Sequence, residues 1–250
     1  MAGHSKWANI KRQKARVDAQ KGKTFARLSR AIIIAARHGG GDPAGNFQLR
    51  SAIEKAKAAG IPSENIERAI AKGTGTLESD APLEEIRYEG YGPGGVAFLM
   101  EALTDNRNRT AADLRAAFNK HGGNLGETGC VGWMFEQWGI VTVAAPIDEE
   151  TFLEALLAAD VETYEILEGV AEVRCPIPAL ETVSETLKKH GYTVLDTESR
   201  WIPMSTVEIT DEETARRVLK LMDAIENLDD IQSVATNVTM SDALMEAMYV

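Results

Sequence analysis

The sequence predicts an α+β protein in which an N-terminal all-helical domain precedes two α+β domains, one of them inserted in the other. Two observations lead to this prediction. Apolar residues recur at helical spacing over the first part of the chain, whereas alternating, β-rich segments interspersed with helices follow residue 82. The charge changes sign near the same place. Residues 1–75 hold 15 Lys and Arg against 5 Asp and Glu, net +10, which leaves 12 against 33, net −21, for residues 76–250.

Three helices are expected in the basic part. Thr24 is a candidate cap for the first, which the glycines at 39–41 end. Asn46 precedes the second, Phe47–Ala59, and Ser63 is placed to cap the third, with Glu64 in its first turn. The predicted core of this domain consists of Phe25, Leu28, Ile32, Leu49, Ile53, Ile66 and Ile70.

Strands and helices alternate after the linker at residues 72–82. Two strands are expected around the turn Gly92–Gly95, then a helix Thr110–His121 and a short strand before Trp138. The turn is interpreted as a hairpin rather than a nucleotide-binding loop. The element after it is a strand rather than a helix, and no Lys-Ser/Thr pair follows the glycines. The next elements are expected in the order strand, helix, strand, strand, helix, strand: Gly139–Ala144, Glu149–Ala159, Glu162–Leu167, Ala171–Arg174, Ala179–Lys189 and Thr193–Asp196. That order is the ferredoxin-like arrangement.

Three further elements follow the ferredoxin-like unit: a strand at Thr206–Thr210, a helix at Glu212–Glu226 and a strand near Ser233–Thr239. Because residues 83–135 hold too few strands to close a sheet, we expect these elements to complete it. The predicted domains are residues 1–75, a discontinuous middle domain of 82–135 plus 204–240, and an inserted ferredoxin-like domain of 136–203.

Enzymatic and metal-binding motifs are absent from the sequence. Cys130 and Cys175 have no CxxC spacing, and the histidines form no cluster, so no metal and no cofactor is expected. The acidic runs 148–150 and 211–213 stand at predicted helix starts, where capping explains them better than catalysis. No P-loop, GxSxG or HExxH is present, which predicts a protein that is not an enzyme and takes no small-molecule substrate.

A membrane partner is not expected either, because no apolar run reaches the roughly 18–20 residues of a membrane span. Residues 1–37 are basic and poor in acid, as transit peptides are, but they contain only two serines, Ser5 and Ser29.

Residues 4–23 carry a basic arm on an otherwise acidic chain. Their cations are spread around most of a helical circumference, an arrangement that suits a phosphate backbone because each neutralised phosphate releases counterions. Trp7 is expected to stack on an unpaired base of RNA, or to pack within the protein on duplex DNA. The competing interpretation is a solvated basic face. The candidate nucleic-acid-binding residues are Lys6, Trp7, Lys11, Arg12, Lys14, Arg16, Lys21, Lys23, Arg27 and Arg30.

A secondary phosphate contact is predicted at Arg107 and Arg109, near the start of the helix Thr110–His121. Exposed N–H groups and the helix dipole favour an anion there. The alternative is that Asn108 caps the helix and both arginines are solvated.

Several long motifs resemble the YebC/PmpR family: MAGHSKWANIKRQKARVDAQKGKTFARLSRAI, GIPSENIERAIAKG, YEGYGPGGVAFLMEALTDNRNRTAADLRAAFNKHGGNLG and GCVGWMFEQWGIV. The resemblance covers the whole chain from Ala2, so it implies that no presequence is expected. It implies a cytoplasmic protein with a helical N-terminal domain and two α+β domains, described as a probable DNA-binding transcriptional regulator. The family also contains a mitochondrial translational activator and bacterial members linked to the ribosome and to relief of stalled translation.

Besides a phosphate-handling enzyme, which nucleotide binding would reveal, two classes of function stay open. The first is a non-enzymatic nucleic-acid-binding regulator of gene expression, whose target is duplex DNA or, for a ribosome-associated translation factor, ribosomal RNA. The second is docking of the acidic domains on a protein such as a ribosomal protein, with the arm as an electrostatic anchor. Deletion of residues 1–37 is expected to abolish nucleic-acid binding while the acidic domains stay folded. The absence of a convincing helix-turn-helix pattern favours RNA.

Overall fold

A computed structural model of the protein describes residues 21–77, 82–145, 148–167, 169–241 and 243–245, with side chains from residue 24 onward. The chain falls into two compact units. Unit 1 comprises residues 1–134 and 203–250, and unit 2 comprises residues 135–202. The predicted α+β class, with N-terminal helices followed by sheet-containing parts, is confirmed. The three-domain division of the chain stays a prediction.

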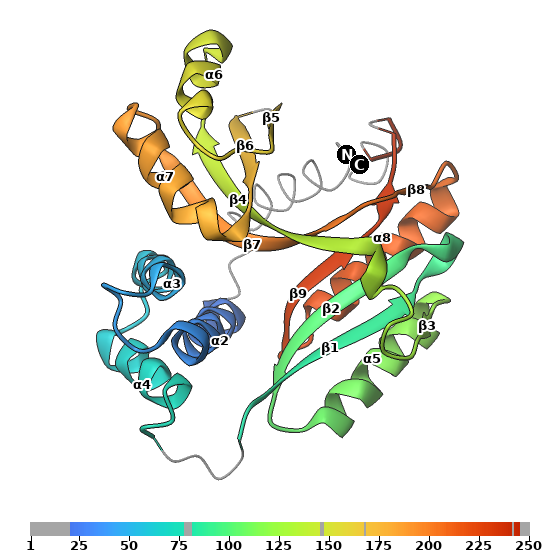
Figure 1. Ribbon diagram of the computed structural model, residues 1–250. Helices are drawn as coiled ribbons and strands as arrows, with labels where there is room; N and C mark the ends of the chain where they lie inside the picture. The colour runs from blue at the N-terminus through green and yellow to red at the C-terminus, as the bar shows by residue number, and fades with distance from the viewer. Residues whose placement is uncertain (1–20, 78–81, 146–147, 168, 242, 246–250) are drawn as a thin grey trace. The chain divides into compact units, whose positions relative to one another are not determined.

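Helices α2 (Lys21–Gly39), α3 (Phe47–Ala58) and α4 (Ser63–Gly73) pack together in unit 1 (Figure 1). Asn46 joins two of them, because its side chain accepts a hydrogen bond from the Leu49 N–H at 3.0 Å and donates to the Ala35 carbonyl at 2.8 Å. The buried core of the three helices includes most of the predicted positions, and its members are Ile32, Ile33, Ala35, Ala36, Leu49, Ala52, Ile53, Ala56, Ile61, Ile66 and Ala69, with Leu103 of the sheet.

Two predicted caps in this region were wrong. Thr24 lies inside α2, which is already helical at Lys21, because the helix extends into the basic segment. Ser63 is the first residue of α4 rather than its cap; Pro62 holds the cap position and provides no side-chain hydrogen bond.

The structure also changes the design of the experiment that deletes the arm. Removing residues 1–37 takes away Ile32, Ile33 and Ala36, all buried in the core, so a clean truncation has to end before α2.

The four-stranded sheet of unit 1 has the order β3-β1-β2-β9. Strands β1 (Glu84–Tyr91) and β2 (Ala97–Thr104) form an antiparallel hairpin, and β3 (Asn124–Leu125) pairs with β1. From the C-terminal segment, β9 (Ile231–Thr236) pairs with β2. Helices α5 (Arg107–His121) and α8 (Glu212–Glu226) cover one face of the sheet (Figure 1), where Phe98, Phe118 and Leu221 are fully buried.

The segment after unit 2 only partly completes this sheet. Strand β9 joins it as expected, but β8 (Val207–Glu208) forms a separate parallel pair with β10 (Val238–Thr239). The Val207 N–H donates to the Asn237 carbonyl at 2.8 Å, and the Ile209 N–H donates to the Thr239 carbonyl at 2.9 Å. Because β8 makes its backbone bonds to β10, it does not extend the larger sheet.

Unit 2 has the predicted β-α-β-β-α-β order, with the strand order β5-β6-β4-β7. That spatial order, with antiparallel β4–β6 and β5–β6 pairs, is the ferredoxin-like arrangement. Its elements are β4 (Phe135–Ala144), α6 (Glu149–Leu157), β5 (Thr163–Leu167), β6 (Val170–Cys175), α7 (Leu180–Lys189) and β7 (Val194–Pro203).

Two strands of unit 2 are longer than predicted. Strand β4 runs through Trp138 and Gly139 without a break, so the expectation of two short strands there was wrong. Gly139 pairs in register with Cys175, and a Cβ at Gly139 would lie 3.1 Å from the Cys175 sulfur, so close packing rather than a turn requires the glycine. Strand β7 continues to Pro203, and Arg200 within it forms an ion pair with the buried Glu172 of β6 at 2.9 Å.

Candidate nucleic-acid interface

The described residues include only the last part of the predicted basic arm. Lys21 and Lys23 lie in the first turn of α2, Arg27 is exposed on the same helix, and Arg30 is partly buried. The remaining candidates lie outside the described residues: Lys6, Trp7, Lys11, Arg12, Lys14 and Arg16.

Arg30 is held by an internal carboxylate. Its guanidinium donates from Nη2 to Oδ1 of Asp230 at 3.3 Å, and Asp230 exposes only 7% of its surface. Oδ2 of Asp230 accepts hydrogen bonds from the hydroxyls of Thr110 at 2.7 Å and Thr104 at 3.1 Å, and from Arg109 at 2.9 Å. Arg30 therefore has a structural role that joins α2 to the sheet.

The Asp230 carboxylate is ionised because its partners outweigh its burial. Burial alone would raise its pKa, but the hydrogen bonds from Arg109, Thr110 and Thr104 hold the pKa below the ordinary value. We call Asp230, Arg30, Arg109, Thr104 and Thr110 the Asp230 cluster. The cluster connects α2, the end of β2, the start of α5 and the turn before β9.

A second contact fixes the C-terminal end of α2. Arg37 lies 3.1 Å and His38 2.9 Å from the carboxylate of Glu85, on β1. Together with Arg30, these contacts direct two arginines and a histidine of α2 toward carboxylates of unit 1. The cations that precede Arg30 are thus the better candidates for a phosphate backbone.

The predicted secondary contact also changes. Asn106 caps α5, accepting from the Arg109 N–H at 3.1 Å, whereas Asn108 lies inside the helix, so the cap proposed for Asn108 was wrong. Arg109 lies 2.9 Å from Asp105 and 2.9 Å from Asp230. Arg107 is exposed. Two carboxylates therefore already neutralise Arg109, which leaves Arg107 as the better phosphate candidate of the pair.

The loop 126–134 is built around the buried carboxylate of Glu89. Glu89 exposes 4% of its surface and accepts three backbone N–H bonds, from Gly129 at 2.8 Å and from Val131 and Gly132 at 2.7 Å each. Burial would raise its pKa, but these three donors hold the pKa below its ordinary value of 4.5. The loop backbone thereby converges on one negative charge.

Glu89→Gln is expected to lower the free energy of unfolding by about 2–3 kcal/mol, because an amide nitrogen then faces backbone donors that the carboxylate had satisfied. The stabilisation by ionised Glu89 is present above pH 4.5 and is lost as the pH falls through the lowered folded-state pKa. Urea unfolding at neutral and acid pH measures both effects. Glu127→Gln, at an exposed position of the same loop, is the control. Equal stability of the two variants would contradict the prediction.

Two aromatic side chains are attached to this loop. The Trp133 indole N–H donates to the Cys130 carbonyl at 3.2 Å, and the Tyr91 hydroxyl donates to the same oxygen at 3.0 Å. Trp133 is 67% exposed and Tyr91 is 36% exposed. The sequence reasoning missed both residues.

Basic side chains gather at the C-terminal end of α5, where it packs against α8. A side chain on Gly122 would collide with the Arg217 guanidinium, so Arg217 lies directly against this glycine, whose φ is +80°. Burial and the nearby charges of Lys120 and Lys220 lower the pKa of His121. We call Lys120, Arg217 and Lys220 the α5–α8 cations; all three are exposed. Glu213 is an acidic neighbour, 4.0 Å from Arg217.

Of the two acidic runs predicted to cap helices, 148–150 and 211–213, only the second does so through a side-chain bond to the backbone. Asp211 accepts from the Thr214 N–H at 2.8 Å at the start of α8, and that bond lowers its pKa. Asp148 holds the cap position of α6 without a side-chain bond to the backbone; the Thr151 hydroxyl donates to its carboxylate instead. Among the residues that the structure describes, no three His, Cys, Asp or Glu side chains gather as metal ligands.

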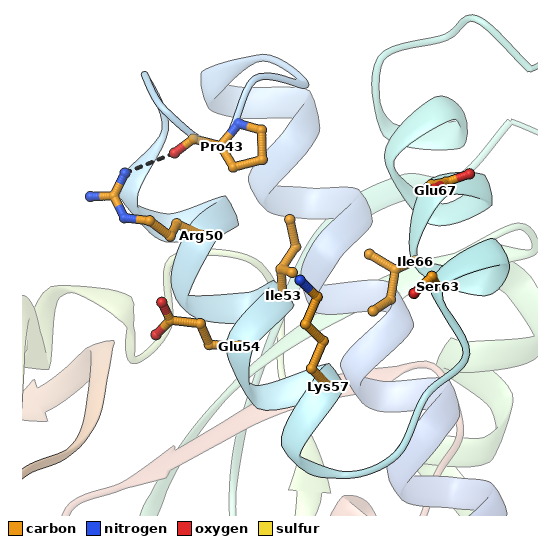
Figure 2. Close-up of a pocket in the computed structure, with 8 residues that line it drawn as sticks. All are labelled: Pro43, Arg50, Ile53, Glu54, Lys57, Ser63, Ile66 and Glu67. Atoms are coloured by element: carbon orange, nitrogen blue, oxygen red, sulfur yellow. Dashed lines mark hydrogen bonds between the residues drawn. The ribbon is translucent and has the colours of Figure 1, made fainter.

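A pocket of about 330 Å³ lies between α3 and α4 (Figure 2). Ile53 and Ile66 line it, with two cations, Arg50 and Lys57, and two carboxylates. The Arg50 guanidinium donates to the Pro43 carbonyl at 2.8 Å. Its two cations and two carboxylates balance, so the lining carries no net charge that would attract a phosphate. Over the described ranges, no helix is both long and apolar enough to cross a membrane.

Comparison with known proteins places the chain in a family. Residues 5–76 match the model of the TACO1/YebC protein N-terminal domain, and residues 83–238 match that of the TACO1/YebC second and third domain. The chain belongs to the TACO1/YebC family. This confirms the resemblance seen in the sequence.

Relatives of this TACO1/YebC chain include proteins named "Probable transcriptional regulatory protein". That of Thermosynechococcus vestitus is 94% identical and that of Cyanothece sp. 68%, each alignment covering 100% of both chains. A crystal structure of a conserved hypothetical protein from Aquifex aeolicus is similar with a TM-score of 0.83 and 48% identity, over 91% of this chain and 94% of that one. The TACO1/YebC fold and the naming of relatives as regulators thus agree with the expectation from the sequence.

Proposed function

We propose that the chain is a non-enzymatic regulator of gene expression that contacts the phosphate backbone of a nucleic acid through the cations of its N-terminal segment. One observation carries the proposal: residues 1–75 have a net charge of +10 on a chain whose remainder has −21. Seven cations crowded within residues 4–23 repel one another, and a polyanion relieves that repulsion. The names of the relatives, probable transcriptional regulatory proteins, support this class of function.

A ribosome-associated translation factor that binds ribosomal RNA and relieves stalled translation is the second candidate. One observation favours it over a reader of duplex DNA. The sequence has no convincing helix-turn-helix pattern, so no helix is assigned as the reader of a major groove. The cytoplasm as the location, and a ribosomal protein as a further partner, belong to this proposal.

A competition experiment tests the proposal. Labelled full-length protein is offered ribosomes and duplex DNA at equal phosphate concentration and physiological salt. Beside it runs a variant in which Lys11, Arg12, Lys14 and Arg16 are glutamine. We expect the wild-type chain to bind at least one target and the variant to lose that binding. Preference for ribosomes supports the translation factor and preference for DNA supports the transcriptional regulator. Unchanged binding by the variant would refute the proposed role of the arm.

A further inference from the structure

Trp133 and Tyr91 expose aromatic surface that the fold itself does not use. Single exposed apolar side chains are common on proteins and indicate little by themselves. These two differ because both donate to the Cys130 carbonyl, at 3.2 Å and 3.0 Å, and are therefore neighbours in a fixed orientation. A rigid side chain loses little conformational entropy when a partner binds, which favours its use in recognition.

The support beneath these aromatics is equally rigid. Glu89 fixes the backbone of Gly129, Val131 and Gly132 on either side of the Cys130 carbonyl and directly before Trp133. A buried carboxylate satisfied by three N–H groups resists displacement, because each donor would otherwise lose a charge-assisted bond. The loop 126–134 thus holds Trp133 at the surface with 67% of the side chain exposed.

The hydrogen bond of the indole narrows the kind of contact that Trp133 can make. Its one polar group, Nε1–H, is satisfied inside the protein, which leaves the apolar ring for a partner. The open ring face can stack on a planar group, and nucleobases provide such a group whatever their sequence.

The charge around the platform is mixed. Tyr88 and Gly90 of β1 face α5, because the Tyr88 hydroxyl donates to the Arg107 carbonyl at 3.0 Å and a Cβ on Gly90 would lie 2.8 Å from the Phe118 ring. Side chains alternate along a strand, so Arg87, Glu89 and Tyr91 share the opposite face of the sheet. Glu127 is exposed and negative, while the charge of Glu89 is buried and taken up by backbone donors. Arg87 is exposed and acts electrostatically on Glu89, so a nucleic-acid strand whose base stacks on Trp133 has a cation for its backbone on the same face.

We propose that Trp133 and Tyr91 form a stacking platform for unpaired bases of single-stranded RNA, with Arg87 on the same face of β1 for the backbone. The inference rests on the proposed function, since it takes a nucleic acid as the partner. RNA is the fitting source because its loops and bulges present unstacked bases, whereas a DNA duplex keeps its bases inside the stack.

The test compares paired and unpaired RNA on the full-length chain. The probe is a fluorescein-labelled RNA of about 12 nucleotides without self-complementarity, free or annealed to its complement, followed by anisotropy. We expect Trp133→Ala to weaken single-strand binding at least about fivefold and to leave duplex binding unchanged. Trp133→Phe, which keeps an aromatic face, restores most of the affinity. Leu157→Ala, at another exposed apolar side chain, in unit 2, is the matched control and has no effect.

Each other outcome is informative. Unchanged single-strand affinity in Trp133→Ala, or an equal loss for single strand and duplex, would overturn the platform. So would a Phe variant as weak as the Ala variant. Equal use of single-stranded DNA of the same sequence would replace RNA by unpaired bases in general and overturn the assignment to RNA. If the wild-type chain binds neither probe but binds ribosomes or duplex DNA in the competition experiment, the platform alone fails. If it binds none of these targets, the proposed function itself fails.

Discussion

Asp230→Ala is expected to destabilise unit 1 by about 3 kcal/mol, because it removes the carboxylate on which the hydrogen bonds of a buried charge network converge. The hydroxyls of Thr104 and Thr110, both buried, lose their shared acceptor, and Arg30 loses the carboxylate that holds it. The value lies at the low end for buried pairs, since Arg109 is half exposed and keeps Asp105 as a partner.

Urea unfolding gives the loss of stability, and hydrogen exchange localises it. Peptides from α2, β2 and β9 are expected to exchange faster in the variant, whereas peptides from unit 2 keep their protection. Asp229→Ala is the control, because Asp229 is an exposed carboxylate next in sequence. An unfolding free energy equal to that of Asp229→Ala would show that the Asp230 cluster contributes nothing to stability.

The sequence predicts elements whose signal is local. Helix α8 occupies Glu212–Glu226 as expected, because an acidic start and an apolar stripe mark it within fifteen residues. Strand β7 was predicted too short, since the charged residues Asp196, Glu198 and Arg200 hide its alternation, and only the distant Glu172 gives Arg200 a buried partner.

The site was harder to predict than the fold, because its contacts join residues that lie far apart in the sequence. Arg30 looks like one more cation of the arm, and its partner Asp230 lies 200 residues further along the chain. Trp133 stands in a glycine-rich segment whose conformation depends on Glu89, itself more than forty residues earlier in the sequence than Gly132. Neither contact produces a periodic pattern in the sequence. The sequence therefore does not show whether an arginine such as Arg30 binds a phosphate or a distant carboxylate of the same chain.

Neutralising the arm is the change with the largest expected effect on binding. With Lys11, Arg12, Lys14 and Arg16 replaced by glutamine, the slope of log affinity for duplex DNA against log salt should become shallower by about 3.6, which is about 0.9 for each lost phosphate contact. For a single-stranded RNA the corresponding change is about 2.8. At about 0.15 M salt, a slope change of 3.6 corresponds to roughly a thousandfold loss of duplex affinity.

The matched control keeps the net charge of the variant but moves the substitutions away from the arm. Its four glutamines replace exposed cations of α3, α4 and α7: Lys57, Arg68, Lys188 and Lys189. Long-range repulsion changes equally in both proteins, so only direct phosphate contacts distinguish their salt slopes. If the salt slope became shallower by the same amount in both variants, the arm would act through net charge alone. If the arm variant kept the wild-type slope and the control did not, the phosphate contacts would lie on the helices instead.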